Sequence, residues 1–390
     1  MTPMTPRERM ATALAHEEPD RVPTALGGGP YGLVDEVYLR LVPALGLDGP
    51  VPPFRSGHNV SYMDDRVLER LGVDTRYVWP TVSPSDAVPV GGDPDTLVDG
   101  YGQPWHRAFP YFYPGDGILA DGDLDDIDAR VSWPDASDPR WTSGVRERAR
   151  LLREQTDCYV VARMVTSHGP YQTASDLRGP EQFLMDMASD ATFTHALIGR
   201  ITDSIVGLTK AYLDAGGRYI DMIELPGDDY ATQTGLAMSP AMFRTYFLPS
   251  IGRMVETIKA FRPDLRVMLH CDGALAPILG DLATAGVDVV HPLEPLPAMD
   301  VDSIKAEYGS RLSFLGAIDI QHALPGSRGD VVDEVRRRIR QLGPGGGYVV
   351  APANHVQPDV PVENVIALYE AARRFGRYPI DVETGQDAGS

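Results

Sequence analysis

The stretch Val267-Met268-Leu269-His270-Cys271-Asp272-Gly273 is a short apolar run that ends in a histidine, a cysteine and an aspartate. Such a run is typical of a buried strand that delivers polar side chains at its C-terminal end. Alternate side chains of a strand share a face. We therefore expect His270 and Asp272 to point the same way, and Cys271 to point the other way as a small buried side chain.

Similar β-like runs recur along the chain, with helical stretches between most of them. Several helical stretches end in glycine just before the next run, which is typical of a helix stop. The expected strands cover residues 22–26, 75–79, 159–165, 218–224, 266–270, 287–291, 312–316 and 347–351. Repeated β-then-α order indicates a parallel sheet, and about eight such units indicate an α/β protein built as a single (β/α)8 TIM barrel.

The barrel is expected to occupy residues 1–380 as one domain, beginning with an N-terminal helix capped by Thr5. Residues 81–157 interrupt the repeat and are rich in Pro, Gly, Asp and aromatic residues. This segment is too long for a plain barrel loop, so we predict an insertion after the second strand that folds over the barrel mouth as a lid or wall. Residues 381–390 are expected to form a flexible tail.

Composition narrows the class of protein. The 390 residues carry a net charge of −20, which argues against nucleic-acid and anionic-membrane partners. Two cysteines, Cys158 and Cys271, cannot form a disulfide framework and fit a reducing cytosol. The sequence shows no signal-peptide core and no apolar stretch near the roughly 18 residues that span a bilayer. We expect a cytoplasmic protein that acts on a small molecule.

Polar residues follow nearly every expected strand, where reactive residues of such barrels lie. They are His168 and Tyr171 after the third strand, Glu224, Asp228 and Asp229 after the fourth, His270 and Asp272 after the fifth, His291 and Glu294 after the sixth, Asp319 and His322 after the seventh, and Asn354 and His355 after the eighth. Histidine is the commonest metal ligand and titrates near neutrality, so its repeated placement at strand ends indicates a functional site.

His270 and Asp272 are the first candidates for a divalent metal site, with zinc among the candidate ions. A hydrogen-bonded strand end and acid–base work without a metal are the alternatives. A zinc site needs a third protein ligand. The candidates for that ligand are His355, Asn354, Glu224 and Asp229.

Asp228 and Asp229 form an acidic cluster with Glu224. These carboxylates either cap a helix N-terminus or provide a general acid of raised pKa or a cation site. Asp228 and Asp229 are therefore candidate catalytic acids and bases, and Asp176 is a third candidate for this role, although it is not part of the cluster. The candidate substrate-binding residues are Tyr171, His168, Asp319 and Gln233, although Asp319 also fits a capping role and Tyr171 a place in the core.

Several separated motifs point to one family. They include Arg7-Glu8-Arg9-Met10-Ala11-Thr12-Ala13-Leu14, Asp20-Arg21-Val22-Pro23, Gly169-Pro170-Tyr171, Met238-Ser239-Pro240-Ala241-Met242-Phe243, Leu269-His270-Cys271-Asp272-Gly273 and Leu315-Gly316-Ala317-Ile318-Asp319. With these motifs the chain resembles the uroporphyrinogen decarboxylase superfamily, which also contains the cobalamin:coenzyme M methyltransferases. The resemblance covers about residues 5–378 and implies a single (β/α)8 barrel, with a homodimer as the usual assembly.

The chain departs from the decarboxylase branch where that branch handles its substrate. The branch's Arg-Gln-Ala-Gly-Arg-Tyr segment corresponds here to Leu26-Gly27-Gly28-Gly29-Pro30-Tyr31, which has no arginine, and its Ser-Asp-Ile-Leu segment to Trp79-Pro80-Thr81-Val82. Its pocket tyrosine falls on Asp176 and its late histidine on Asn354. Because an octacarboxylate needs several cations to bind it, haem-pathway decarboxylation is not expected.

At the fifth expected strand, the chain resembles the methyltransferase branch more closely than the decarboxylase branch. Its zinc-binding His-x-Cys pair corresponds to His270 and Asp272, and its later cysteine to Asn354. The loss of both sulfur ligands makes the site oxygen-rich and widens the choice of divalent ion. The resemblance implies metal-dependent methyl or other one-carbon transfer on a small polar substrate, with a corrinoid or corrinoid protein as a candidate partner. The alternatives are a decarboxylase or lyase acting on a small carboxylate, and a non-catalytic barrel that binds a corrinoid or another ligand.

Overall fold

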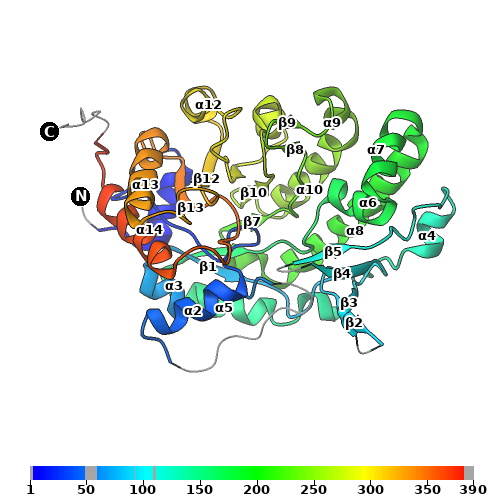
Figure 1. Cartoon of the computed structure of the whole chain (residues 1–390), viewed down its shortest axis with the longest axis horizontal. Helices are drawn as coiled ribbons and strands as arrows, with labels where there is room; N and C mark the ends of the chain where they lie inside the picture. Colours follow the sequence, from blue (N-terminus) through cyan, green and yellow to red (C-terminus); the bar gives the residue numbers. More distant parts are fainter. Residues whose placement is uncertain (1–2, 49–58, 92, 109–110, 382–390) are drawn as a thin grey trace.

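A seven-stranded parallel sheet forms the centre of the computed structural model, which describes residues 3–48, 59–91, 93–108 and 111–381 (Figure 1). Its strands follow one another in chain order as β1-β6-β7-β10-β11-β12-β13. They are β1 (Thr75–Val78), β6 (Tyr159–Ala162), β7 (Met222–Glu224), β10 (Arg266–His270), β11 (Val289–His291), β12 (Ser313–Ile318) and β13 (Tyr348–Pro352). All seven overlap the strands expected from the sequence, so the prediction of a parallel α/β protein is confirmed.

The segment expected as the first strand, residues 22–26, forms an isolated parallel bridge instead of a regular strand. Thr24 pairs with Val350 of β13, and the Ala25 amide donates to the Val350 carbonyl at 2.9 Å. On the other side, the Asp74 amide donates to the Thr24 carbonyl at 3.0 Å. Pro23 lacks an N–H group and therefore limits a regular ladder here. The segment nonetheless bonds to β13 and to the residue that directly precedes β1.

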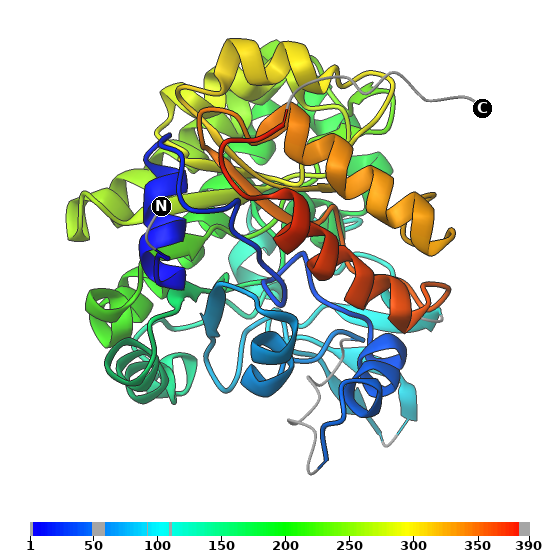
Figure 2. The ribbon, with the colours of Figure 1, turned by 90° about the vertical axis from the view of Figure 1, so that its left-hand side faces the viewer.

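Helices cover the outside of the sheet, and in Figure 2 α13 and α14 lie side by side on it. The helices are α1 (Pro6–Leu14), α2 (Asp35–Ala44), α3 (Asp65–Leu71), α4 (Asp126–Arg130), α5 (Val145–Gln155), α6 (Pro170–Arg178), α7 (Pro180–Ser189), α8 (Ala191–Gly216), α9 (Pro240–Tyr246), α10 (Leu248–Phe261), α11 (Leu279–Thr284), α12 (Val301–Tyr308), α13 (Arg328–Leu342) and α14 (Val362–Phe375). The described residues also form the 3-10 turns η1 (Pro139–Thr142), η2 (Gly217–Tyr219) and η3 (Ala276–Ile278). The expected Thr5 cap of α1 is confirmed as a capping box with Glu8.

The segment 81–157 contains a separate four-stranded antiparallel sheet in the order β2-β3-β4-β5. Its strands are β2 (Val88–Val90), β3 (Asp93–Val98), β4 (Pro104–Ala108) and β5 (Tyr111–Pro114), and a small hairpin elsewhere is formed by β8 (Ala231–Thr232) and β9 (Gly235–Leu236). At the end of the segment, α5 packs on β1, β6 and α8. The helix α5 therefore belongs to the helical layer of the βα repeat, and the inserted part is shorter than the sequence predicts.

Within the described ranges, none of the helices combines the length and the apolar character that crossing a membrane requires.

A buried ion-pair network ties the N-terminal segments to the beginning of β1. Asp74 is 1% exposed and accepts Arg9 Nη1 at 2.5 Å and Arg21 Nη2 at 2.9 Å. Its other carboxylate oxygen, Oδ2, accepts the Thr24 amide at 2.8 Å. One carboxylate thus holds helix α1 and the 22–26 segment against the edge of the sheet.

Replacing this carboxylate, as in Asp74→Ala, should lower the free energy of unfolding by about 3–5 kcal/mol, because Arg21 loses its buried carboxylate and Arg9 retains that of Asp20 alone. Urea denaturation measures the change. The exposed ion pair between Arg328 and Glu370, 2.7 Å long, provides the control. Glu370→Ala should cost less than about 1 kcal/mol. Equal losses in the two variants would contradict the structural role given to Asp74.

Candidate active site

A cavity of about 640 Å³ lies at the C-terminal ends of the parallel strands. The strand ends contribute polar side chains, and the inserted sheet contributes an aromatic wall. Residues that line it from the main sheet and its loops include Arg163, His168, Asp229, His270, Asp272, Asn354 and His355. Those from the insertion include Asp99, Tyr101, Gln103, Trp105, Tyr111, Phe112 and Tyr113. The volume is in the range of small-molecule sites.

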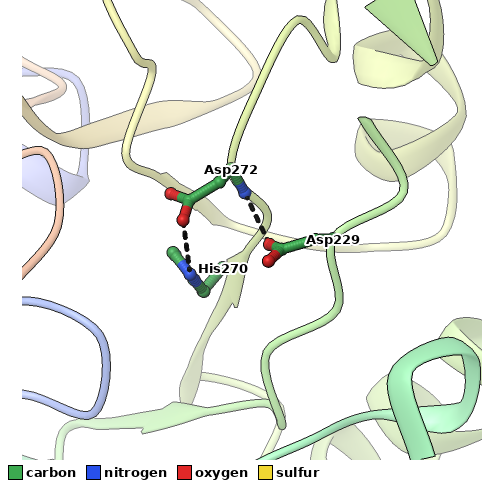
Figure 3. Close-up of side chains that lie close together, drawn as sticks. All are labelled: Asp229, His270 and Asp272. Atoms are coloured by element: carbon green, nitrogen blue, oxygen red, sulfur yellow. Dashed lines mark hydrogen bonds and ion pairs between the residues drawn. The ribbon is translucent and has the colours of Figure 1, made fainter. Parts of the chain in front are cut away.

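Asp229, His270 and Asp272 converge on one point of this cavity (Figure 3). One ligand atom from each residue lies within 4.8 Å of the others. His270 Nε2 is 3.7 Å from Asp272 Oδ2, and the Asp272 amide donates to Asp229 Oδ1 at 2.9 Å. His270 and Asp272 line the cavity while Cys271 is fully buried, which agrees with the alternation of side chains along a strand. We refer to these three residues as the acidic triad.

The triad concentrates electron-pair donors at the cavity wall, where His270 is buried and Asp272 is partly buried. Burial, followed by the neighbouring carboxylates of Asp229 and Glu294, raises the pKa of Asp272 well above its ordinary value. Burial lowers the pKa of His270, and Asp229 and Glu224 only partly offset it. Ionising Asp272 beside Asp229 is therefore costly unless a cation enters.

Glu224 and His355, both predicted as metal ligands, lie outside the triad. Glu224 is 1% exposed, and its carboxylate accepts the Tyr31 hydroxyl at 2.8 Å and the Gly29 amide at 2.9 Å. His355 Nε2 donates to the Gly29 carbonyl at 2.9 Å. Both side chains thus hold the loop that begins at Gly27. A Cβ atom on Gly28 would lie 2.5 Å from Glu224 Oε1, so this loop needs glycine.

Asp228, predicted as a catalytic acid, caps helix α6. Its carboxylate accepts the amides of Tyr171 at 3.0 Å and Gln172 at 2.7 Å, and the Tyr230 hydroxyl at 2.7 Å. Burial raises the pKa of Asp228 to about 7, although these three hydrogen bonds oppose the rise. Asp228 does not line the cavity. The capping alternative that the sequence left open therefore describes its contacts.

Three predicted substrate-binding residues also lie outside the cavity lining. The Tyr171 ring packs in the core, with its centroid 5.3 Å from that of Phe247. Asp319 Oδ1 accepts the Gln321 amide at 2.7 Å, which is a capping contact. Gln233 is exposed in the turn between β8 and β9. Their positions do not support direct contact with a substrate in this cavity.

His168 and Asp176 form a second polar pair in the cavity wall. His168 Nδ1 lies 2.8 Å from Asp176 Oδ2, and both residues line the cavity. Burial alone lowers the pKa of the His168 imidazole, but the Asp176 carboxylate more than offsets this, and the pKa is raised. The sequence identified both residues but not their pairing, because they stand on either side of the start of α6.

Two further residues were given lesser roles by sequence reasoning. Asn354 donates its side-chain amide to Asp272 Oδ2. His291 Nδ1 lies 2.9 Å from His270 Nδ1, and His291 is fully buried. The parallel register of β10 and β11 pairs His270 with His291. The sequence placed both histidines at the ends of consecutive strands, and that was the available signal for their contact.

The model of the family described as Uroporphyrinogen decarboxylase (URO-D) matches residues 122–375, more than half of the chain. This chain belongs to the uroporphyrinogen decarboxylase family. The match includes the acidic triad and the His168–Asp176 pair. It confirms the resemblance of the motifs from which the family was inferred.

Curated relatives of this URO-D family chain carry the name uroporphyrinogen decarboxylase. The protein of Nostoc punctiforme is 28% identical over 187 residues, which are 48% of this chain and 49% of the relative. The protein of Hordeum vulgare is 25% identical over 185 residues, or 47% and 52% of the two chains. The chain thus spans about half the length of the curated relatives it matches.

Among solved structures, the URO-D family chain is similar to a methyltransferase from Methanosarcina mazei. The TM-score is 0.62 at 21% identity, and the match covers 96% of this chain and 99% of the other. At this level of identity the likeness establishes a shared fold.

The His168–Asp176 pair should make stability depend on pH. A raised folded-state pKa means that the protonated imidazole stabilises the protein below the unfolded pKa of about 6.5, and that this contribution is lost as pH rises through the folded pKa. Asp176→Asn should therefore lower the free energy of unfolding more at pH 6 than at pH 9. Urea denaturation at both pH values measures this difference.

As a control, Asp176→Asn is introduced into a protein that already carries His168→Gln. In that background, Asp176→Asn should have the same effect at both pH values. A pH-dependent loss that persists without the imidazole would show that another group is responsible.

Proposed function

We propose that this chain is a metal-dependent enzyme that transfers a methyl or other one-carbon group to or from a small polar substrate in the cavity. The observation that carries the proposal is the convergence of Asp229, His270 and Asp272, whose ligand atoms all lie within 4.8 Å of one another. The match to a methyltransferase fold supports the choice of reaction class.

The donor set fits a divalent ion. Ligand oxygen and nitrogen atoms lie about 2.0–2.2 Å from zinc, so two ligands of one ion are at most about 4.4 Å apart. The observed limit of 4.8 Å needs only a small side-chain adjustment. Two carboxylates and one imidazole suit zinc and also harder divalent ions. When bound, the ion would supply Lewis-acid polarisation of a substrate oxygen or sulfur.

His168 and Asp176 are the proposed acid–base pair. Asp176 accepts from His168 Nδ1, which leaves Nε2 as the nitrogen that exchanges a proton with the substrate. As a methyl group moves from its donor, which would keep the electron pair of the broken bond, onto a hydroxyl or thiol acceptor, the proton of that acceptor would pass to His168 Nε2. The raised pKa of His168 suits it to hold that proton near neutral pH.

The charge of the cavity opposes uroporphyrinogen as the substrate. Four carboxylates line the cavity: Asp99, Asp176, Asp229 and Asp272. Among the described lining residues, Arg163 is the one arginine or lysine, and its guanidinium lies over the Tyr62 ring at 4.9 Å. An octacarboxylate would meet repulsion from these carboxylates and would find one permanent cation among the described lining residues. A small carboxylate could still pair with Arg163, so a lyase acting on such a substrate is the second candidate.

We also propose how the barrel closes, what the inserted sheet does and which partners the chain has. We infer that the 22–26 segment completes a (β/α)8 barrel, because it bonds to β13 and to the start of β1. The inserted sheet β2–β5 would act as the lid or wall of the cavity, to which it contributes Trp105, Tyr111 and Phe112. A corrinoid or corrinoid protein remains the proposed methyl carrier, and a homodimer the proposed assembly.

The metal site is tested by elemental analysis of protein purified without chelators, with about one divalent ion per chain expected. His270→Ala and Asp272→Ala should each remove most of this metal, because each deletes one of three ligands. His355→Ala should retain it, since its imidazole bonds to the Gly29 carbonyl. Absence of metal from the wild type, or equal loss in all three variants, would overturn the site.

Turnover tests the reaction class. Under anaerobic conditions the enzyme should transfer the methyl group of methylcob(III)alamin to a hydroxyl or thiol acceptor. The loss of absorbance from the cobalt–carbon bond measures this transfer. Uroporphyrinogen should not be consumed. His168→Gln should reduce the methyl-transfer rate by about 100- to 10,000-fold, the contribution of a positioned acid–base group. Efficient release of carbon dioxide from uroporphyrinogen would refute the proposal.

A further inference from the structure

A hydrogen-bonded chain of one carbonyl group and two imidazole rings runs from the end of β13 to His270 of the acidic triad. The carbonyl oxygen of Pro352, at the end of β13, lies 3.2 Å from His291 Nε2. His291 Nδ1 lies 2.9 Å from His270 Nδ1. His270 Nε2 then faces Asp272 at 3.7 Å. A Cβ atom on Gly316 would lie 2.7 Å from the Pro292 carbonyl oxygen and 3.1 Å from His291 Cδ2, so a side chain there would crowd the backbone beside this ring and the ring itself.

The positions of the protons follow from this order. A carbonyl oxygen only accepts, so His291 Nε2 must carry the hydrogen in its bond to Pro352. His291 is fully buried, and its other polar contact is another imidazole, so its neutral form is favoured. A neutral His291 with hydrogen on Nε2 has a lone pair on Nδ1. The bond between the two Nδ1 atoms therefore requires the hydrogen to be on His270 Nδ1.

The consequence for His270 is a lone pair on Nε2, directed toward the two carboxylates of the triad. This lone pair and the two carboxylates together offer three ligand atoms to a cation. The other tautomer would instead place a hydrogen on Nε2 and block coordination. Outer partners of metal-binding histidines fix the tautomer in this way.

We infer that His291 is a positioning residue that holds His270 in the tautomer competent to bind a divalent metal through Nε2. This inference rests on the metal site of the proposed function and adds to it a residue that does not itself touch the metal. The substitution His291→Phe removes the acceptor for His270 Nδ1–H and retains a flat ring of similar size. His291→Gln is the matched variant, because its amide can accept from His270 and donate to Pro352.

The first measurement reads the tautomer in metal-free protein. Histidine labelled with ¹⁵N gives distinct NMR shifts for protonated and unprotonated ring nitrogens, and loss of a signal in His270→Gln assigns His270. In the wild type, His270 should show a protonated Nδ1 and an unprotonated Nε2. In His291→Phe, protonation should move toward Nε2. Protonation of Nε2 in the wild type would overturn the inference.

The second measurement is the affinity for Zn²⁺ by competition with a chromogenic chelator. His291→Phe should bind Zn²⁺ about 10- to 100-fold more weakly than the wild type, as expected for an outer partner of a ligand. His291→Gln should recover most of the affinity, and circular dichroism should show that both variants are folded. Unchanged Zn²⁺ affinity in a folded His291→Phe would overturn the inference.

The two measurements separate this inference from the proposed function. A wild type with the expected tautomer but without Zn²⁺ binding would support the proton assignment and overturn the metal site. A wild type that binds Zn²⁺ at His270 while its metal-free form carries the hydrogen on Nε2 would support the metal site and overturn the role of His291.

Discussion

The candidate site depends on the common direction of its strands. Because β7, β10 and β11 are parallel, the residues after their last hydrogen-bonded pairs meet at one edge of the sheet. Asp229 follows β7, Asp272 follows β10 and His291 ends β11, so no local motif would bring the three together. An antiparallel neighbour would send its corresponding residues to the opposite edge. The polar chemistry of the cavity is therefore a property of the sheet topology.

Burial makes this arrangement effective and also costly. Within the triad, burial raises the pKa of Asp272 and lowers that of His270, so the neutral forms of both are favoured. Acceptors held close together in such surroundings favour a cation more strongly than the same groups would in water. The hydrogen bonds that Asp272 makes with Asn354, and His270 with His291, keep these two side chains in place. Elsewhere, buried carboxylates serve architecture: Asp74 joins the N-terminal segments to β1, and Asp228 caps α6.

Much of the fold follows from sequence pattern. Short apolar runs, several of them preceded by a glycine that ends a helix, predict the seven main strands, since a strand buried on both faces must be almost wholly apolar. The 22–26 segment is harder to predict, because the preference of Pro23 competes with the pairing available at the sheet edges. The helix α5 is assigned to the insertion by composition, and only its packing on β1 and β6 reveals its place in the repeat.

The site is predicted less completely, for a physical reason. Strand alternation correctly pairs His270 with Asp272, because that geometry is local. The third member of the triad, Asp229, cannot be chosen over Glu224 by a local pattern. The choice depends on which carboxylate bonds to the Gly27–Tyr31 loop, and in the structure it is that of Glu224. That contact joins residues nearly two hundred positions apart. The carboxylates of Asp228 and Asp319 follow strands and accept backbone amides as caps. From sequence alone, a carboxylate in such a place fits a capping role and a catalytic role equally well, because its hydrogen-bond donors are not known.

The inserted sheet β2–β5 and the parallel sheet are hydrogen-bonded as separate units, yet both border the same cavity. The aromatic wall comes from the first and the acidic triad from the second. Substitutions at Trp105, Tyr111 or Phe112 can therefore reshape the wall without altering strand register beneath the triad. Sequence variation in the inserted sheet can thus change the shape of the cavity while the parallel sheet keeps its polar groups in place.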